Sequence, residues 1–413
     1  MSTSSGTSSP PKWNQLLICN DKGPLPTVAN AVRVLQKDPT LGPDVLWRDD
    51  FLDRIQIRNS DQREWRDDDD TRLTVYMQET AGILRLPKHL VRDAVELVTR
   101  QRTRHVVRDY LASLVWDGIS RIDEAFCDHW NAEPTIFQPH DYIRAISHNF
   151  FIGLIARVQR PGCQLDEMVV FESARQGVGK TSALRVLGGS WYAVAHERVT
   201  DKDFFQDIQG KWIIEISELS SFSAATVERI KTVISTPSDR FRGSYDRRSS
   251  DHGRQCVFAG TTNTDDWGMD ATGLRRFWPV TVGEINLVTL AAARDQLFAE
   301  AAARWHAGEH WWDVPTSAIT VQAERQHHDE WTDPVLAWAA LQLAHGADCI
   351  AVKDVLLGAL KFTLDKLDKG GQMRVGRVLK LASWRRNPRT KRWYPPVHLT
   401  DEGGTQDSST FTA

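Results

Sequence analysis

No stretch of this 413-residue sequence approaches the ~20 consecutive apolar residues that a helix needs to cross a lipid bilayer. The N-terminus is rich in Ser, Thr and Pro and lacks the apolar core of a secretory signal peptide. Hydrophobic residues make up 41% of the chain and charged residues 25%, as is ordinary for a soluble globular protein. The sequence therefore predicts a cytoplasmic protein with no membrane partner.

Closely spaced cysteines are absent as well. The chain has five cysteines and no CxxC pair, at Cys19, Cys127, Cys163, Cys256 and Cys349. This spacing predicts neither a zinc site nor a disulfide framework, and it fits a reducing cytosol. The net charge of -3 excludes a uniformly basic coat for nucleic acid but leaves room for local basic patches.

Three short apolar runs alternate with helical segments in the middle of the chain, at Met168–Phe171, Trp212–Ile216 and Cys256–Ala259. Strands that alternate with helices favour a mainly parallel sheet covered on both faces. A chain of this length also predicts two or three domains. The central region is therefore expected to be an α/β domain.

A phosphate-binding motif follows the first apolar run, in the sequence ESARQGVGKT that ends at Thr181. The P-loop pattern is GxxxxGK[ST], placed after a strand and before a helix. Gly179, Lys180 and Thr181 fit this pattern, and Gly177 adds backbone freedom. Ala174 replaces the first glycine and tolerates a positive φ poorly, so we expect a slightly altered entry to the loop.

In such a loop, backbone N–H groups at the helix start point toward phosphate oxygens. Lys180 would neutralise the β/γ-phosphate charge, and Thr181 would coordinate Mg²⁺. The predicted nucleotide contacts are Ala174, Gln176, Gly177, Val178, Gly179, Lys180, Thr181 and Ser182. The alternative is a glycine-containing turn between a strand and a helix, with no ligand.

Two acids accompany the second apolar run. Glu218 falls just past the run, where the end of a strand would present it, so we predict that it orients water and holds Mg²⁺. Glu215 lies inside the run and is expected to be buried. Because an unpaired buried charge is strongly disfavoured, we expect it to be either the partner of a buried cation or a second acid near Mg²⁺. The alternative for Glu218 is a surface acid after a strand.

The third apolar run ends in polar residues, and Asn263 is placed to contact the attacking water or the γ-phosphate. Downstream, Arg275 and Arg276 precede an aromatic residue and suit an arginine finger, which often comes from a neighbouring subunit. A solvated face is the alternative for this arginine pair. Because the guanine-reading sequence Asn-Lys-x-Asp is missing, ATP with Mg²⁺ is the expected cofactor.

The order of these motifs resembles the virulence-associated E family of phage- and plasmid-type P-loop ATPases, which are related to superfamily 3 helicases. The stretches that carry the resemblance are HVVRDYL (105–111), LVWDG (114–118), PGC (161–163), the P-loop, residues 210–219, TTN (261–263) and GLRRFWPV (273–280). The resemblance as a whole covers roughly Trp13 to Trp312. The resemblance implies an oligomeric, hexameric ATPase that acts on DNA, single-stranded or at a fork, in the replication of a mobile element. Many relatives carry a primase domain upstream, so we expect priming here to need a separate primase.

Two basic segments are candidates for contact with DNA. Residues 229–254 carry seven basic and three acidic side chains, and superfamily 3-like ATPases insert a DNA-gripping hairpin at this place. The predicted contacts are Arg240, Arg242, Arg247 and Arg248 for phosphates, and Tyr245 or Phe241 for stacking on a base. The alternative is a role at a subunit interface, in which Lys231 and Arg242 reach a neighbour's ATP.

The second basic segment spans residues 374–393 and holds eight basic residues and no acid. A helix followed by a basic, strand-like stretch resembles a winged helix-turn-helix, in which the helix enters a groove and the wing contacts phosphates. The predicted contacts are Arg374, Arg377, Lys380, Arg385 and Arg386. A basic solvated surface or a protein-docking module is the alternative.

Together these motifs predict an α/β protein with a P-loop (AAA+ or superfamily 3-like) ATPase core, an N-terminal mixed α/β domain and a C-terminal winged-helix-like domain. The expected boundaries are a disordered tail at 1–12, the N-terminal domain at 13–134, the core at 135–320, the C-terminal domain at 330–399 and a second tail at 400–413. The expected function is that of an ATP-driven, ring-forming DNA helicase or translocase. Two rivals stay open: an ATP-switched replication initiator or regulator that grips DNA without unwinding it, and a monomeric P-loop kinase of a small molecule.

Overall fold

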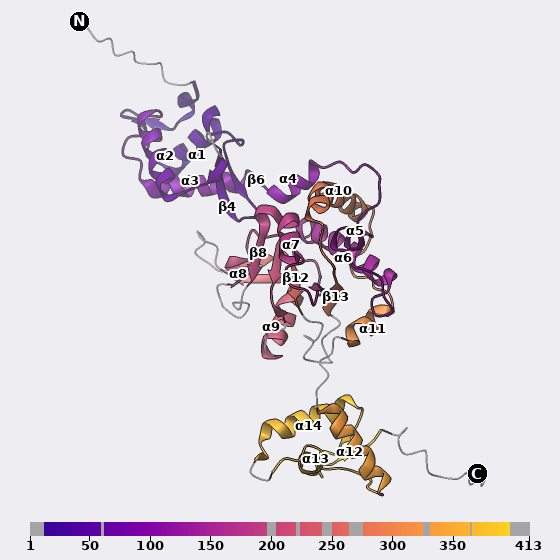
Figure 1. The fold of residues 1–413 in the computed structure, drawn as a ribbon. Helices are drawn as coiled ribbons and strands as arrows, with labels where there is room; N and C mark the ends of the chain where they lie inside the picture. Colours follow the sequence, from indigo (N-terminus) through magenta and orange to yellow (C-terminus); the bar gives the residue numbers. More distant parts are fainter. Residues whose placement is uncertain are drawn as a thin grey trace, which may run out of the picture. The chain divides into compact units, whose positions relative to one another are not determined.

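A computed structural model describes residues 12–58, 62–195, 204–219, 224–241, 250–263, 276–324, 331–363 and 366–396. These residues divide into two compact units, one within Met1–Asp265 and Arg275–Glu324 and the other within Arg325–Ala413. Figure 1 shows the helices and strands of both units.

The first part of the larger unit is a small mixed sheet with helices packed on it. Its strands have the order β5-β4-β3-β6, and only the β3–β6 pair is parallel. The elements are η1 (Lys12–Leu16), β1 (Cys19–Asn20), β2 (Gly23–Pro24), α1 (Val28–Lys37), η2 (Pro39–Leu41), β3 (Leu46–Asp49), β4 (Arg54–Arg58), β5 (Gln62–Glu64), α2 (Asp67–Glu79), α3 (Lys88–Arg100) and β6 (Thr103–Arg104). Four aspartates begin α2, where the positive end of the helix dipole stabilises negative charge.

The central part of this unit is built on a parallel sheet with the strand order β13-β7-β12-β9-β8. The strands are β7 (Met168–Glu172), β8 (Tyr192–Ala195), β9 (Ile213–Ile216), β12 (Val257–Thr262) and β13 (Phe277–Thr281). Strand β8, which follows the P-loop helix in the chain, is therefore at one edge of the sheet. Strand β12 lies between β7 and β9. All five strands run in one direction, so their carboxyl ends share one edge of the sheet.

Helices and a hairpin surround this sheet. They are α4 (Val106–Ala112), α5 (Ala125–Trp130), α6 (His140–Gln159), α7 (Lys180–Gly188), η3 (Gly189–Trp191), α8 (Phe204–Asp207), α9 (Ala224–Ser235), the antiparallel pair β10 (Ser238–Phe241) and β11 (Ser250–Gly253), α10 (Leu287–His306) and α11 (Ser317–Glu324). Helix α10 contacts α4, α5, α6 and α7. Figure 1 shows α10 beside α5 and α6.

The central strands are buried on both faces, which explains why they read as continuous apolar runs. Val169 and Phe171 belong to the large cluster that contains α6 and α10. On the other face, an added Cβ at Gly260 would meet Val170 and Met168. The side chains of successive residues in β7 thus point to opposite faces of the sheet, as the pleat of a strand requires.

The described part of the smaller unit contains three helices and a short antiparallel hairpin. They are α12 (Thr332–Ala344), α13 (Val352–Gly358), α14 (Lys369–Leu381), β14 (Arg385–Arg386) and β15 (Trp393–Tyr394). An isolated antiparallel bridge joins Ile350 to Trp393, so the segment before α13 pairs with the last strand. Val335, Val375 and Trp384 are among the residues that form its core.

Among the helices that the structure describes, none is both long and apolar enough to span a lipid bilayer.

Candidate nucleotide-binding site

The loop between β7 and α7 has the backbone that the P-loop motif predicts. Gly177 and Gly179 have φ values of 78° and 96°, which only glycine adopts without strain. Ala174 is not among the described residues with positive φ. The alanine therefore needs no left-handed backbone at this position.

Lys180 begins α7 and points to the end of β12. Its Nζ donates a hydrogen bond to Asn263 Oδ1 at 2.9 Å, and the residue is 8% exposed. Burial lowers the pKa of Lys180, and the nearby charge of Glu215 opposes this shift. The structure therefore brings the predicted phosphate-binding cation and the predicted γ-phosphate sensor into direct contact.

Glu215 is fully buried and accepts hydrogen bonds from three hydroxyl groups. Thr181 Oγ1 and Thr261 Oγ1 each donate to its Oε1 at 2.7 Å, and the Tyr192 hydroxyl donates to Oε2. Burial and the contact with Glu215 raise the pKa of Tyr192 far above its usual value, so this hydroxyl is a donor. The acid inside the second apolar run thus lies beside the threonine that was predicted to coordinate Mg²⁺.

A cavity of about 320 Å³ opens at this edge of the sheet. The residues around it are Gly177, Val178, Gly179, Lys180, Thr181, Ser182, Ser217, Glu218, Thr261, Thr262 and Asn263. Glu218 has a φ of 56°, an uncommon value for a residue other than glycine, and such residues are frequent at functional sites. Glu218 therefore faces the space next to the P-loop, while Glu215 lies beneath it.

A segment far along the chain supports the P-loop from behind. Ile285 N donates to Val178 O at 2.9 Å, and Asn286 N donates to His129 O at 2.9 Å. A Cβ at Gly179 would lie 3.4 Å from Ile285 Cβ, an ordinary van der Waals contact, so the positive φ of 96° and not lack of space favours glycine here. The loop is therefore held by the residues between β13 and α10.

Arg276 lies at the opposite edge of the sheet. It precedes β13, whose first residue, Phe277, pairs with the first residue of β7, Met168. The length of β7, four steps of ~3.3 Å or about 13 Å, separates this edge from the start of the P-loop. Arg276 lines a second cavity of about 550 Å³ with Glu167 and Trp278. Arg275, the other predicted finger, lies outside the described residues.

The hairpin β10–β11 lies in the segment that was predicted to grip DNA. The Arg240 side chain is 74% exposed, and its Nε lies 3.9 Å from Asp251 Oδ1. At the base of the hairpin, Arg254 and Asp239 form a buried ion pair. Arg242, Tyr245, Arg247 and Arg248 lie outside the described residues, and of Phe241 only the backbone, at the end of β10, is described.

The basic residues of the smaller unit have different surroundings. Lys380, Arg385 and Arg386 are exposed. The guanidinium of Arg374 instead lies over the ring of Trp331, 4.1 Å from its centroid. The side chain of Arg377 lies outside the described part of the structure.

Several residues in or beside the candidate nucleotide pocket were not identified from the sequence. Tyr192 reaches Glu215 from the edge strand β8, and no motif marks it. Thr261 was recognised only as part of a strand end that includes Asn263. Glu172, at the end of β7, is buried and accepts from Thr281 Oγ1 at 2.9 Å. Tyr192 and Thr261 carry hydroxyl groups, and their hydrogen-bond partner Glu215 is distant from them in the sequence.

Comparison with known proteins supplies a family. Residues 111–330 match the family model of the virulence-associated protein E-like domain, which is just over half of the chain. The chain belongs to this family. Among curated proteins, none matches the chain.

Solved structures show weak similarity to this virulence-associated E-like chain. The apo C-terminal region of NrS-1 has 12% identity, covers 82% of this chain and 83% of its own, and gives a TM-score of 0.38. The A form of that region has 13% identity, coverages of 85% and 95%, and a TM-score of 0.39. A point mutant of Thermotoga maritima RuvB has 12% identity, coverages of 63% and 95%, and a TM-score of 0.22. These TM-scores are too low to establish a shared overall fold.

Proposed function

We propose that this protein binds and hydrolyses ATP with Mg²⁺ and uses the energy to move along or unwind DNA. The observation that supports this most is the convergence of four side chains at the carboxyl edge of the sheet. Lys180 contacts Asn263, and Thr181 contacts Glu215, around a cavity lined by main-chain glycines. A cation, a hydroxyl ligand, an acid and a polar sensor are the parts that phosphoryl transfer from a nucleotide requires.

The roles follow from the positions. Lys180 and the amides at the start of α7 would hold the phosphates, and Thr181 would coordinate Mg²⁺. Glu215 would hold the magnesium side of the site through Thr181, because its carboxylate is buried and already hydrogen-bonded. Glu218 would orient the attacking water, since it lines the open part of the cavity.

The position of Arg276 favours an oligomer. It lies at the far edge of the sheet, too distant to reach the P-loop of its own chain. An arginine that stabilises the γ-phosphate in the transition state is expected for this chemistry. We therefore propose that Arg276, or its neighbour Arg275, completes the site of an adjacent subunit in a ring, which we expect to be a hexamer.

DNA is the proposed partner of both basic segments. The exposed Arg240 lies on the hairpin β10–β11, and exposed basic residues occupy β14 and the end of α14. Three helices followed by a hairpin, with the bridge from Ile350 to Trp393, support a winged-helix assignment for the smaller unit. Family membership favours replication of a mobile genetic element as the setting.

An ATP-switched DNA-binding initiator or regulator is the second candidate. The exposed basic hairpin β14–β15 favours it, because this unit would bind DNA without any motor activity. Strand separation that depends on hydrolysis supports the motor. Nucleotide-dependent DNA binding without strand separation supports the switch.

The test is the rate of ATP hydrolysis by the full chain, with and without single-stranded DNA. Lys180→Ala is expected to abolish turnover, and Lys22→Ala, at an exposed lysine far from the pocket in sequence, is expected to leave it unchanged. Absence of adenine-nucleotide binding by the unmodified protein, or full turnover in Lys180→Ala, would overturn the proposal. A parallel assay on a forked duplex separates the motor from the switch.

A further inference from the structure

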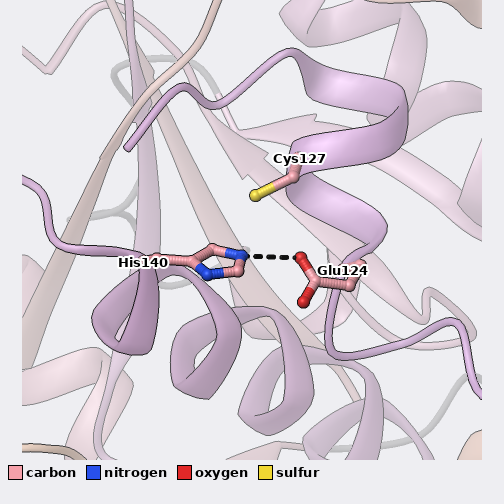
Figure 2. Close-up of side chains that lie close together, drawn as sticks. All are labelled: Glu124, Cys127 and His140. Atoms are coloured by element: carbon pink, nitrogen blue, oxygen red, sulfur yellow. Dashed lines mark hydrogen bonds and ion pairs between the residues drawn. The ribbon is translucent and has the colours of Figure 1, made fainter. Parts of the chain in front are cut away.

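Three side chains of different chemistry meet between α5 and α6, away from the nucleotide pocket. Glu124 directly precedes α5, Cys127 follows one turn later on the same helix, and His140 is the first residue of α6. Figure 2 shows the three side chains directed toward one another. His140 Nε2 lies 2.9 Å from Glu124 Oε2, and the three ligand atoms all lie within 4.8 Å of one another.

An imidazole nitrogen, a sulfur and a carboxylate oxygen form a donor set that zinc commonly binds. Bonds of ~2.0–2.3 Å in a tetrahedral site place neighbouring ligand atoms roughly 3.3–3.8 Å apart. The Glu124–His140 contact of 2.9 Å would therefore need to open by about 0.5 Å, and ligand atoms up to 4.8 Å apart would need to approach by about 1 Å. Rotamer adjustment at a partly exposed site supplies such shifts. We propose that Glu124, Cys127 and His140 bind one Zn²⁺ or another thiophilic divalent ion, with a water molecule in the fourth position.

The main competing explanation is an ion-pair network that joins two helices. Arg144 Nε lies 3.0 Å from Glu124 Oε1, on the carboxylate oxygen that does not face His140. Both partners are substantially exposed, at 49% for the Arg144 side chain and 38% for Glu124, so the pair contributes little stability. A metal would bind the oxygen next to His140 and leave the Arg144 contact in place.

A nucleophilic role for the cysteine is a second alternative. Burial, together with the charges of Glu124 and Asp128, raises the pKa of the Cys127 thiol to about 11. A reactive cysteine needs a lowered pKa, so that the thiolate is present at neutral pH. The raised pKa therefore argues against a nucleophilic role for Cys127, and the metal assignment rests on the geometry of the three ligand atoms.

Such an ion would fix α5 against the start of α6. The carboxyl end of α5 in turn contacts the segment behind the P-loop, since Gly283 N donates to Trp130 O and Asn131 O at 3.1 and 3.0 Å. The proposed metal would therefore join α5 to the start of α6 and keep one position open to water, and the proposal does not depend on the nucleotide chemistry.

The spacing of the cysteines could not reveal this group. Cys127 belongs to no CxxC pair, and the histidine lies on another helix. The fold, rather than a local motif, brings the third ligand to the other two.

The experiment is Co²⁺ titration of the full-length, metal-stripped protein, followed by ultraviolet and visible absorption. A cobalt–thiolate bond gives a charge-transfer band in the near ultraviolet, which histidines and carboxylates alone do not give. We expect this band to saturate at one ion per chain and to disappear when Zn²⁺ is added. Cys127→Ser should abolish the band, and His140→Gln should weaken Co²⁺ binding.

Cys163→Ser is the matched control, because Cys163 is also a half-buried thiol and lies outside the group. This variant should keep the band. Arg144→Gln should keep or strengthen it, since a positive charge beside the ion is removed. A wild-type protein without the band, or a band that survives in Cys127→Ser, would overturn the proposal, and circular dichroism of each variant confirms that it is folded.

Discussion

The two edges of the central parallel sheet differ in how their charged groups are accommodated. At the carboxyl edge, Lys180 is bonded to Asn263 and Glu215 to three hydroxyl groups, around a cavity of about 320 Å³. At the amino edge, Arg276 and Glu167 line a larger cavity of about 550 Å³. Burial and the adjacent Asp166 raise the pKa of Glu167 there.

This difference suggests how the proposed catalysis is divided between subunits. The carboxyl edge holds the groups proposed to bind phosphate, magnesium and water, but one of the two arginines predicted as the finger, Arg276, is at the other edge. A chain with this arrangement cannot bring its own Arg276 to its own P-loop. A neighbouring copy that places its amino edge against this pocket would complete it.

Substitution of Arg276 tests this division most strongly. Arg276→Ala is expected to lower ATP turnover by roughly 10³–10⁵-fold, the range for removal of an arginine finger. Mixing this variant with Lys180→Ala should partly restore turnover, because hybrid sites contain both groups; turnover is measured by phosphate release. Arg72→Ala, at an exposed helix pair with Asp68, is the control and should have no effect. Wild-type turnover in Arg276→Ala, or no rescue in the mixture, would contradict shared sites through this residue.

Separate substitutions of the two acids sharpen the description of the carboxyl edge. Glu218→Gln should lower the rate of hydrolysis by roughly 10²–10⁴-fold, as expected for loss of a general base, and should leave nucleotide binding intact. Glu215→Gln should instead weaken Mg²⁺-dependent nucleotide binding, because Glu215 contacts Thr181. Single-turnover hydrolysis and fluorescent-nucleotide binding separate the two effects. If Glu218→Gln weakened nucleotide binding and Glu215→Gln slowed hydrolysis alone, the roles proposed for the two acids would have to be exchanged.

At the amino edge, we expect the buried ion pair of Arg254 with Asp239 to contribute mainly to the stability of the fold. Arg254 Nε donates to Asp239 Oδ2 at 3.0 Å, and both residues are buried. Arg254→Met should lower the free energy of unfolding by about 3–5 kcal/mol, because an uncompensated carboxylate stays buried. Urea denaturation measures this loss. Arg240→Ala, at the exposed pair with Asp251, should change it by at most ~1 kcal/mol. Equal effects of the two substitutions would contradict the buried-pair interpretation.

The smallest expected effect concerns Tyr192, which connects the edge strand β8 to Glu215. Tyr192→Phe removes one hydroxyl donor from a buried carboxylate and should lower stability by about 1.5–3 kcal/mol. Thr181 and Thr261 would still hold the other oxygen, so turnover should fall only modestly. Thermal unfolding and the Mg²⁺ dependence of hydrolysis provide the measurements. If Tyr192→Phe were more stable than the unmodified protein, the hydrogen bond to Glu215 would not compensate for the cost of burying the tyrosine hydroxyl.

Much of the fold could be predicted because its local signals are strong. The apolar runs predicted β7 and β9 to within one residue at each end, and they predicted the start of β12 to within one residue but its end three residues early. The P-loop was visible because its lysine, threonine and glycines are adjacent in the chain. The order of the strands was not predicted, because periodicity reports burial and not which strand lies beside which.

The predicted site residues differ in how well the sequence defined them. Lys180 and Asn263 were proposed separately, and the structure shows them in contact. Glu215 was left between two roles, because an acid in an apolar run does not reveal its partners. Tyr192 and the Glu124–Cys127–His140 group gave no signal, since each depends on side chains that only the folded chain brings together.

One consequence of the sheet order concerns β12, which lies between β7 and β9 and is hydrogen-bonded to both. Its carboxyl end leads to Asn263, and its amino end continues from Arg254 and the hairpin β10–β11. An extended strand of six residues is roughly 20 Å long and cannot be lengthened without breaking its ladders. The same ladders oppose sliding of β12 past β7 and β9, so the strand holds Asn263 and the base of the hairpin at a fixed separation and ties both to the central sheet.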